Sequence, residues 1–191
     1  MKIAIIGTGN LGLSIAKGLI INNTYTDLYL TKRNLDSIRE YEEYKSVFLT
    51  SDNSEAVKNA DILIFAVQPG QFETILKEVK EHLNEKHVII STITGFQLSR
   101  IEAQINVDFP IIRAMPNTAI SVARSMTCLC SNTAGVSKLP IAEAIFNGLG
   151  TSMIIEEKLM QAATVLCASG IAFWMRLIRA TTQGGVQMGF D

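Results

Sequence analysis

The sequence predicts an α/β protein with a doubly wound, mostly parallel sheet that continues into an all-helical segment. Three observations lead to this fold class. Short β-branched runs alternate with longer mixed segments, a glycine-rich loop follows the first run, and the pattern becomes helical throughout near Glu156. We therefore expect two regions, residues 1–155 and 156–191.

Each expected element rests on the spacing of its apolar residues. Leu11, Ile15 and Leu19 recur at helical spacing, whereas the run DILIFAV at 61–67 is fully apolar, as in a strand covered on both faces. In chain order, the pattern predicts a strand at 2–7, a helix at 10–22, a strand at 27–31, a charged helical segment at 35–44, a strand at 47–49, a helix at 54–59, a strand at 61–67, a helix at 71–83, a strand at 87–92, a helix at 97–105, strands at 109–114 and 125–130, a helix at 137–149 and a strand at 151–155.

The composition excludes some classes of partner. The chain has 17 basic and 18 acidic residues and a net charge of −1, so it offers no basic surface to nucleic acid. Cys128, Cys130 and Cys167 are an odd number of cysteines without a disulfide framework. They favour structural thiols in a reducing cytosol over a metal site. We expect a cytoplasmic protein without a metal.

The stretch at 159–175 is long and apolar enough to be considered as a membrane span. Gln161, Ser169 and Gly170 interrupt it, and Arg176 and Arg179 follow. We therefore expect a buried core helix or a dimer helix, and no membrane contact. The first apolar run is too short, and too soon broken by glycine, to be a secretory signal.

The first strand–helix junction carries the pattern G-x-G-x-x-G, formed by Gly7, Thr8, Gly9, Asn10, Leu11 and Gly12. Gly7 permits a tight turn, Gly9 lets the backbone approach a pyrophosphate, and Gly12 lets the helix pack closely on the strand. The helix N-terminus offers free N–H groups and a positive dipole end to the anion. Because a strand, a helix and repeated βα units surround the pattern, it predicts a Rossmann-type dinucleotide-binding domain.

The end of the second strand favours NADPH over NADH. NAD-binding domains usually place an Asp or Glu about 20 residues past the glycines, where it holds the ribose hydroxyls. Here that position reads Thr31-Lys32-Arg33-Asn34, and its hydroxyl, cations and amide suit a 2′-phosphate. The alternative is a solvated polar loop in which Asp36 serves the ribose.

Three further segments resemble the pyrroline-5-carboxylate reductase family. Residues 66–69 (AVQP) resemble the family's Ala-Val-Lys-Pro loop, with Gln68 in place of the lysine, and residues 113–118 (RAMPNT) resemble its Arg-x-Met-Pro-Asn-Thr segment. Glu156-Glu157 with residues 167–172 (CASGIA), and the ending at 184–189 (GGVQMG), resemble the two ends of its long helix. The resemblance runs through the whole chain in order.

This resemblance implies NAD(P)H-dependent reduction of 1-pyrroline-5-carboxylate to L-proline. It also implies a homodimer, or a higher homo-oligomer, formed through a helical dimerisation domain that begins at residue 156. Glu157 would lie near the substrate; its alternative role is that of a first-turn acid stabilising a helix dipole. Together, the motif and the resemblance imply cofactor contacts from Gly7, Thr8, Gly9, Asn10, Leu11, Gly12, Thr31, Arg33, Asn34, Asn53, Ala66, Val67, Gln68, Pro69, Thr92, Thr94, Met115, Pro116 and Asn117.

The family continues through more helices and a Ser-Pro-Gly-Gly-Thr loop that places the substrate carboxylate, whereas this sequence ends at Asp191. We therefore expect either a shortened reductase or a non-catalytic, dinucleotide-binding dimer. Two other enzyme classes share this type of domain. A 3-hydroxyacid dehydrogenase needs a catalytic lysine on the long helix, where Lys158 stands too early, and a deazaflavin-dependent NADP reductase would bind that flavin.

Overall fold

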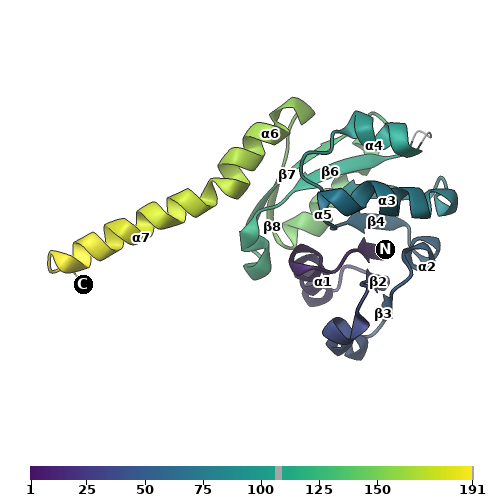
Figure 1. Cartoon of the computed structure of the whole chain (residues 1–191), viewed down its shortest axis with the longest axis horizontal. Helices are drawn as coiled ribbons and strands as arrows, with labels where there is room; N and C mark the ends of the chain where they lie inside the picture. The colour runs from purple at the N-terminus through teal and green to yellow at the C-terminus, as the bar shows by residue number, and fades with distance from the viewer. Residues whose placement is uncertain (106–108, 191) are drawn as a thin grey trace.

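The computed structural model describes residues 1–105 and 109–190, and it contains an eight-stranded sheet flanked by helices (Figure 1). The strands are β1 Lys2–Ile6, β2 Asp27–Thr31, β3 Val47–Thr50, β4 Ile62–Phe65, β5 Val88–Ser91, β6 Ile111–Met115, β7 Ser125–Ser131 and β8 Gly150–Ile154. Their order is β3-β2-β1-β4-β5-β6-β7-β8, and neighbours are parallel except β6 and β7. This confirms the predicted fold class.

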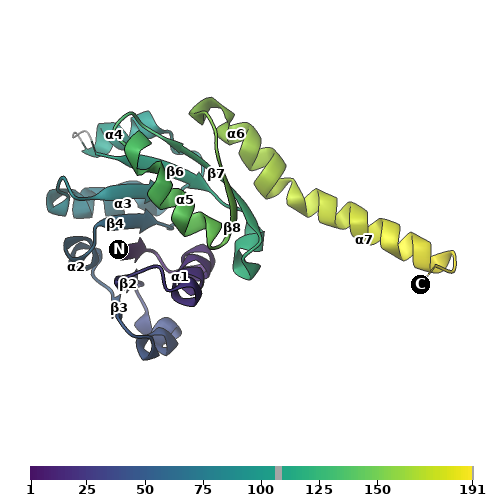
Figure 2. The ribbon, with the colours of Figure 1, turned by 180° about the vertical axis from the view of Figure 1, so that it is seen from behind.

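Helices cover both faces of the sheet (Figure 2). One face is covered by α1 (Asn10–Asn22), α5 (Leu139–Asn147) and the 3-10 segment η1 (Leu35–Glu43). The other is covered by α2 (Asn53–Asn59), α3 (Pro69–Val79), α4 (Leu98–Ile105) and α6 (Met160–Ala163). Short 3-10 segments are η2 (Lys80–His82), η3 (Thr118–Val122), η4 (Val136–Lys138) and η5 (Glu157–Leu159); the π-helical turn η6 (Thr164–Ser169) leads into α7 (Ile171–Gln187).

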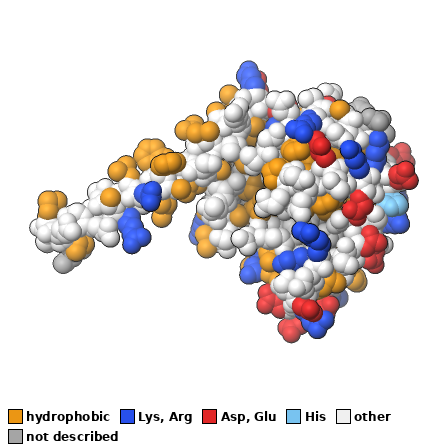
Figure 3. Space-filling model, viewed as in Figure 1, with side chains coloured by type: hydrophobic (Ala, Val, Ile, Leu, Met, Phe, Trp, Pro, Cys, Tyr) orange, Lys and Arg blue, Asp and Glu red, His pale blue; other side chains and the backbone are white. Residues whose placement is uncertain are grey.

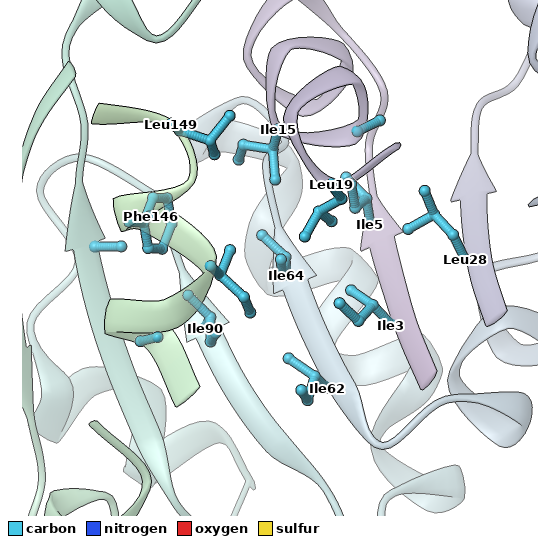
Figure 4. Close-up of a cluster of buried hydrophobic side chains, with 14 of the residues drawn as sticks. Ile3, Ile5, Ile15, Leu19, Leu28, Ile62, Ile64, Ile90, Phe146 and Leu149 are labelled. Atoms are coloured by element: carbon cyan, nitrogen blue, oxygen red, sulfur yellow. The ribbon is translucent and has the colours of Figure 1, made fainter. Parts of the chain in front are cut away.

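Aliphatic side chains from successive strands fill the face under α1 and α5. Figure 4 shows Ile3, Ile5, Ile62, Ile64 and Ile90 of the sheet beneath Ile15 and Leu19 of α1 and Phe146 of α5. Leu149 packs against α1 so closely that a Cβ on Gly18 would lie 1.8 Å from its Cδ2. Leu149, in the segment between α5 and β8, is therefore part of the core against which α1 packs.

An aromatic row joins the helices on the opposite face. The ring of Phe72 on α3 meets Phe65 of β4 at 5.4 Å and Phe96 at 5.1 Å, both edge-on. The Arg100 guanidinium of α4 lies 4.2 Å from the Phe96 ring and donates to Glu73 of α3 at 2.7 and 3.0 Å. These contacts fix α3 and α4 side by side.

After β8 the chain is helical, and α7 leaves the sheet as a projecting arm (Figures 1 and 2). Of the two expectations for residues 159–175, the buried core helix is wrong beyond the first turn, whereas the dimer helix is compatible with the structure. Met160 is 2% exposed, but Phe173 is 74% and Trp174 is 61% exposed. Figure 3 shows hydrophobic side chains along the length of the arm. Apolar surface of this extent marks a contact with another molecule.

Among the described residues, one helical stretch, Glu157–Gln187, passes a test of length and composition for crossing a membrane. Core helices of soluble proteins and signal sequences pass the same test, and Arg176 and Arg179 lie within this stretch. Asp191, the end of the predicted helical region, lies outside the described residues.

Most predicted elements are present with ends shifted by a few residues. The predicted helix at 35–44 is a 3-10 segment, because its buried anchors, Ile38 and Tyr41, stand three residues apart and suit the three-residue 3-10 repeat. The predicted helix at 71–83 begins earlier, at Pro69, and its end tightens into η2. The predicted helix at 137–149 likewise divides into η4 and α5, with a proline in the first turn of α5.

Candidate functional site

The glycine loop turns sharply between the end of β1 and α1. Gly7 has a φ of +94°, and a Cβ there would lie 2.3 Å from Cγ1 of Val67. A Cβ on Gly12 would lie 2.3 Å from the carbonyl oxygen of Gly7. Both positions exclude a side chain because protein atoms already occupy the space.

Gly9 is different, because a Cβ on it would meet no atom within 4 Å. It is the N-cap of α1, no side chain caps this helix, and the first turn contains no acidic residue. The first N–H groups of a helix lack partners within the helix and carry a positive dipole end. Gly9 therefore borders a space suited to an anion.

That space is a hollow of about 520 Å³ at the carboxyl ends of β1, β2 and β4. Its walls include nine of the residues predicted from the sequence: Gly7, Thr8, Gly9, Thr31, Arg33, Asn53, Ala66, Val67 and Gln68. In doubly wound sheets, ligands bind at this end of the strands.

Thr31 holds the glycine loop against β2. Its hydroxyl accepts a hydrogen bond from the Gly7 N–H at 3.1 Å, and its carbonyl oxygen accepts from the N–H and the hydroxyl of Thr8, each at 2.9 Å. Thr31 and Thr8 are both buried. Sequence reasoning predicted Thr31 as a ribose contact and missed this bracing role.

The far end of the hollow carries positive charge. Lys32, Arg33 and Ser51 line it; Lys32 is the second cation expected from the sequence, and Ser51 was not predicted. The predicted residue Asn34 instead caps η1, because its side chain accepts a hydrogen bond from the Asp36 N–H. The Asp36 carboxylate pairs with Arg39 at 3.0 Å and is absent from the described lining, so the geometry does not favour its alternative role at a ribose.

One wall of the hollow comes from α3, which the sequence did not single out. Gln71, Thr74, Ile75 and Glu78 face the space on successive turns, and Glu78 accepts from the Asn53 amide at 3.4 Å. The three-to-four-residue spacing of these positions puts them on one helix face. That spacing was the available signal, but it does not distinguish a ligand-facing stripe from a solvated one.

A second hollow, of about 610 Å³, begins at the next residues of α1. It is lined mainly by apolar atoms from α1, the loop after β6, η3 and η6: Asn10, Leu11, Ser14, Pro116, Asn117, Thr118, Ile120, Ser121, Ala168 and Ser169. Asn10, Leu11, Pro116 and Asn117 were predicted. Asn117 is held in place, because its N–H donates to the Ser125 hydroxyl and its side chain caps η3.

Six residues predicted to contact the cofactor line neither hollow: Asn34, which caps η1, and five others. Gly12 is packed inside the loop, and Pro69 is the first residue of α3. Thr92 is buried, with its hydroxyl donating to the Phe65 carbonyl at 2.8 Å, and Thr94 is exposed after β5. Met115 is buried at the end of β6.

Glu157, predicted near a substrate, forms a junction between three elements. One of its carboxylate oxygens, Oε1, accepts from the Arg113 guanidinium of β6 at 2.8 Å and from the Leu98 N–H at the start of α4 at 2.7 Å. The Arg113 side chain is 8% exposed. Neither partner of Glu157 was identified from the sequence.

The described residues contain no group of three or more His, Cys, Asp or Glu side chains arranged to hold a metal ion. Cys128 and Cys130 are buried on one face of β7, and Cys167 is half-buried. All three are free thiols.

Two family models match this chain. One, described as NADP oxidoreductase coenzyme F420-dependent, matches residues 2–95, and the other, described as pyrroline-5-carboxylate reductase dimerisation, matches residues 157–191.

Curated relatives match almost the whole chain. Pyrroline-5-carboxylate reductase 1 of Dictyostelium discoideum is 40% identical over 98% of this chain and 36% of its own length, and reductase 2 of that organism is 38% identical over 99% and 69%. This chain thus spans about a third of the first relative and about two thirds of the second.

Solved structures agree. A pyrroline-5-carboxylate reductase from Coxiella burnetii superposes with a TM-score of 0.93 at 31% identity, over 100% of this chain and 72% of that one. The Plasmodium falciparum enzyme, solved with NADP bound, superposes with a TM-score of 0.84 at 25% identity, over 100% and 71%.

Proposed function

This chain belongs to the pyrroline-5-carboxylate reductase family, and on that premise we propose that it binds NADPH and serves the reduction of 1-pyrroline-5-carboxylate to L-proline. The observation that carries the proposal is the pair of hollows that border consecutive residues at the start of α1, one at Gly7 to Gly9 and the other at Asn10 and Leu11. One has a glycine cradle and a basic end, and the other has a mainly apolar lining.

The first hollow fits the phosphate-bearing half of the cofactor. Gly9 leaves open space where the pyrophosphate would approach the N-terminus of α1, and Arg33 and Lys32 stand where a 2′-phosphate needs cations. Ala66 to Gln68 continue the wall toward the second hollow, which would take the nicotinamide and the imine. We propose residues 1–155 as the cofactor domain and residues 156–191 as part of the dimerisation domain.

When bound, NADPH would supply a hydride to the carbon of the protonated imine, which becomes the amine as the cofactor becomes NADP⁺. The residues of this chain have the task of holding the two reactants at the right distance and angle, and that alone can supply much of the rate. Pro116 and Asn117, of which Asn117 is held by the Ser125 hydroxyl, would form the floor under the reacting ring. The mainly apolar lining would keep water away from the hydride path.

The test is pyrroline-5-carboxylate-dependent oxidation of NADPH, followed by absorbance with the purified 191-residue chain, beside a direct measurement of NADPH binding. Turnover and binding together support the whole proposal. Binding without turnover would leave the cofactor domain standing and reject reduction by this chain. Absence of binding would overturn both parts.

We also propose a homodimer formed through the arm, in the cytoplasm and away from membranes. The match of residues 157–191 to a dimerisation domain supports this arrangement, as does the exposed apolar stripe on α7. Arg176 and Arg179 within the helix would be costly at the centre of a bilayer but harmless at the rim of a dimer.

The match of residues 2–95 to a coenzyme-F420-dependent oxidoreductase model gives the deazaflavin alternative its one specific support. A titration with that flavin, followed by absorbance, separates the two functions. Flavin binding that competes with the imine would favour the alternative.

A further inference from the structure

The strongest unexplained feature outside the two hollows is the junction at Glu157. It joins β6, which leads into the loop that lines the second hollow, to α4 and to η5, the first turn of the helical stretch that ends in the arm α7. These three elements are far apart in sequence, since Arg113 and Glu157 are separated by 44 residues and Leu98 and Glu157 by 59.

The junction is specific in its chemistry. A carboxylate at the first N–H of a helix satisfies one of the four free donors there and complements the dipole. The same oxygen meets a guanidinium that is almost fully shielded from water, so removing Glu157 would leave the Arg113 charge buried without its acid. A water molecule would not replace the carboxylate equally well as the acceptor for the Leu98 N–H or for the Arg113 guanidinium.

The neighbouring acid shows the contrast. Glu156 is 69% exposed in its side chain, and its carboxylate pairs with Lys158 at the surface at 2.6 Å. Adjacent glutamates at the start of the helical region therefore make one surface contact and one part-buried tertiary contact, in which the Glu157 side chain is 31% exposed.

The geometry points to Glu157 as a positioning residue. Through Arg113 and the Leu98 N–H, Glu157 fixes the direction in which the arm leaves the sheet. That direction sets the position, relative to the cofactor, of the wall of the second hollow that lies on the side of the arm. That wall is Ala168 and Ser169 of η6, which face Pro116 and Asn117 across the hollow. Since η6 follows η5 within the same continuous helix, a tilt at Glu157 moves that wall directly. This inference rests on the proposed function for its effect on turnover, but not for its effect on the arm.

The single tryptophan makes the arm direction measurable. Trp174 lies on α7, so energy transfer from Trp174 to bound NADPH reports the position of the arm relative to the cofactor site. We compare Glu157→Ala with Glu156→Ala, the matched control at the next residue. Glu157→Gln, which keeps an acceptor oxygen, and Arg113→Lys, which keeps the cation, replace Glu157→Ala if that variant does not fold.

We expect Glu157→Ala to change the transfer efficiency and to lower kcat by roughly tenfold to a hundredfold, because small misplacements of reacting groups are costly. The NADPH Kd should stay within about twofold, since Glu157 is outside the lining of the first hollow. Glu157→Gln should recover part of kcat, and Glu156→Ala should match the unchanged chain in every measurement.

Wild-type transfer efficiency in folded Glu157→Ala, or in folded Glu157→Gln and Arg113→Lys, would overturn the inference even if the thermal stability falls. If the unchanged chain binds NADPH but shows no turnover, the reduction step of the proposed function fails, while the transfer measurement still decides the role of Glu157. Failure of the two ideas is thus distinguishable.

Discussion

At the scale of single residues, the glycine loop separates stability from ligand binding. Gly7 and Gly12 are glycines because protein atoms fill the space of a side chain, whereas Gly9 faces open space. The same substitution therefore has different consequences within one loop.

Gly9→Ala should lower the free energy of unfolding by no more than about 1 kcal/mol, the usual cost of alanine at an N-cap, because the Gly9 backbone is extended and a Cβ there meets no atom within 4 Å. It should weaken NADPH binding at least about tenfold, because its methyl group enters the pyrophosphate space. Gly12→Ala should instead cost about 1–3 kcal/mol of stability through overpacking. Urea unfolding and an NADPH titration check both; equal effects of the two variants on both quantities would contradict the assignment.

Arg33→Ala should weaken NADPH binding by about tenfold or more and change NADH binding little, because a charged hydrogen bond to a 2′-phosphate is lost. Arg39→Ala is the matched control, since Arg39 is exposed and pairs with Asp36 outside the hollow. The readout is the ratio of the NADH dissociation constant to the NADPH dissociation constant for each variant. A similar loss for both nucleotides would place the 2′-phosphate elsewhere.

At the scale of elements, periodicity predicted the strands and most helices, because burial on one or both faces leaves a repeat in the sequence. Contacts between distant elements leave no such repeat. Thr31 reads as a strand residue near a ribose, and its bracing of Gly7 depends on how β1 and β2 pair. Glu157 reads as a first-turn acid, and only the folded chain brings Arg113 beneath it.

The pairing of β6 with β7 also places the Cys130 thiol where its pKa is shifted. Burial raises the pKa of the Cys130 thiol to about 11 from a usual value of 9.0; the Arg113 charge lowers it and the Glu157 charge raises it by lesser amounts. Below pH 9 the thiol is protonated in both folded and unfolded chains. As the pH rises toward 11 the unfolded chain ionises first, so the stability associated with this thiol is lost.

The wild-type chain should therefore lose about 2 kcal/mol more of its unfolding free energy between pH 9 and pH 11 than Cys130→Ala, which has no thiol to ionise. Urea unfolding at several pH values measures the two slopes. Parallel slopes would show that the Cys130 thiol has no raised pKa.

At the scale of the whole molecule, the arm is a surface without a partner within the described chain. Phe173 and Leu177, and likewise Trp174 and Ile178, stand four residues apart and form one stripe. The sequence predicted this apolar content but left open whether the same chain or a second copy covers it, because hydropathy does not say which molecule covers a helix.

A double change, Leu177→Glu with Ile178→Glu, should convert the dimer to monomers while the NADPH Kd stays within about twofold. Charged groups in the stripe would be desolvated without partners on association. Light scattering measures the mass, and Lys45→Glu, on the exposed surface far from the arm, is the control. A monodisperse monomer for the wild-type chain would sink the dimer proposal.

The contact between Leu149 and Gly18 has a consequence for the chain during its synthesis. Leu149 packs against α1 at Gly18, and α5 covers the same face of the sheet beside α1, so a nascent chain that has emerged only through β5 leaves part of this apolar face uncovered. At typical translation rates of about 5–20 residues per second, that exposure lasts for several seconds. The interval before α5 emerges is thus the one in which a ribosome-bound chain most needs a chaperone, and the arm, which is made after α5, meets its partner only after this core has closed.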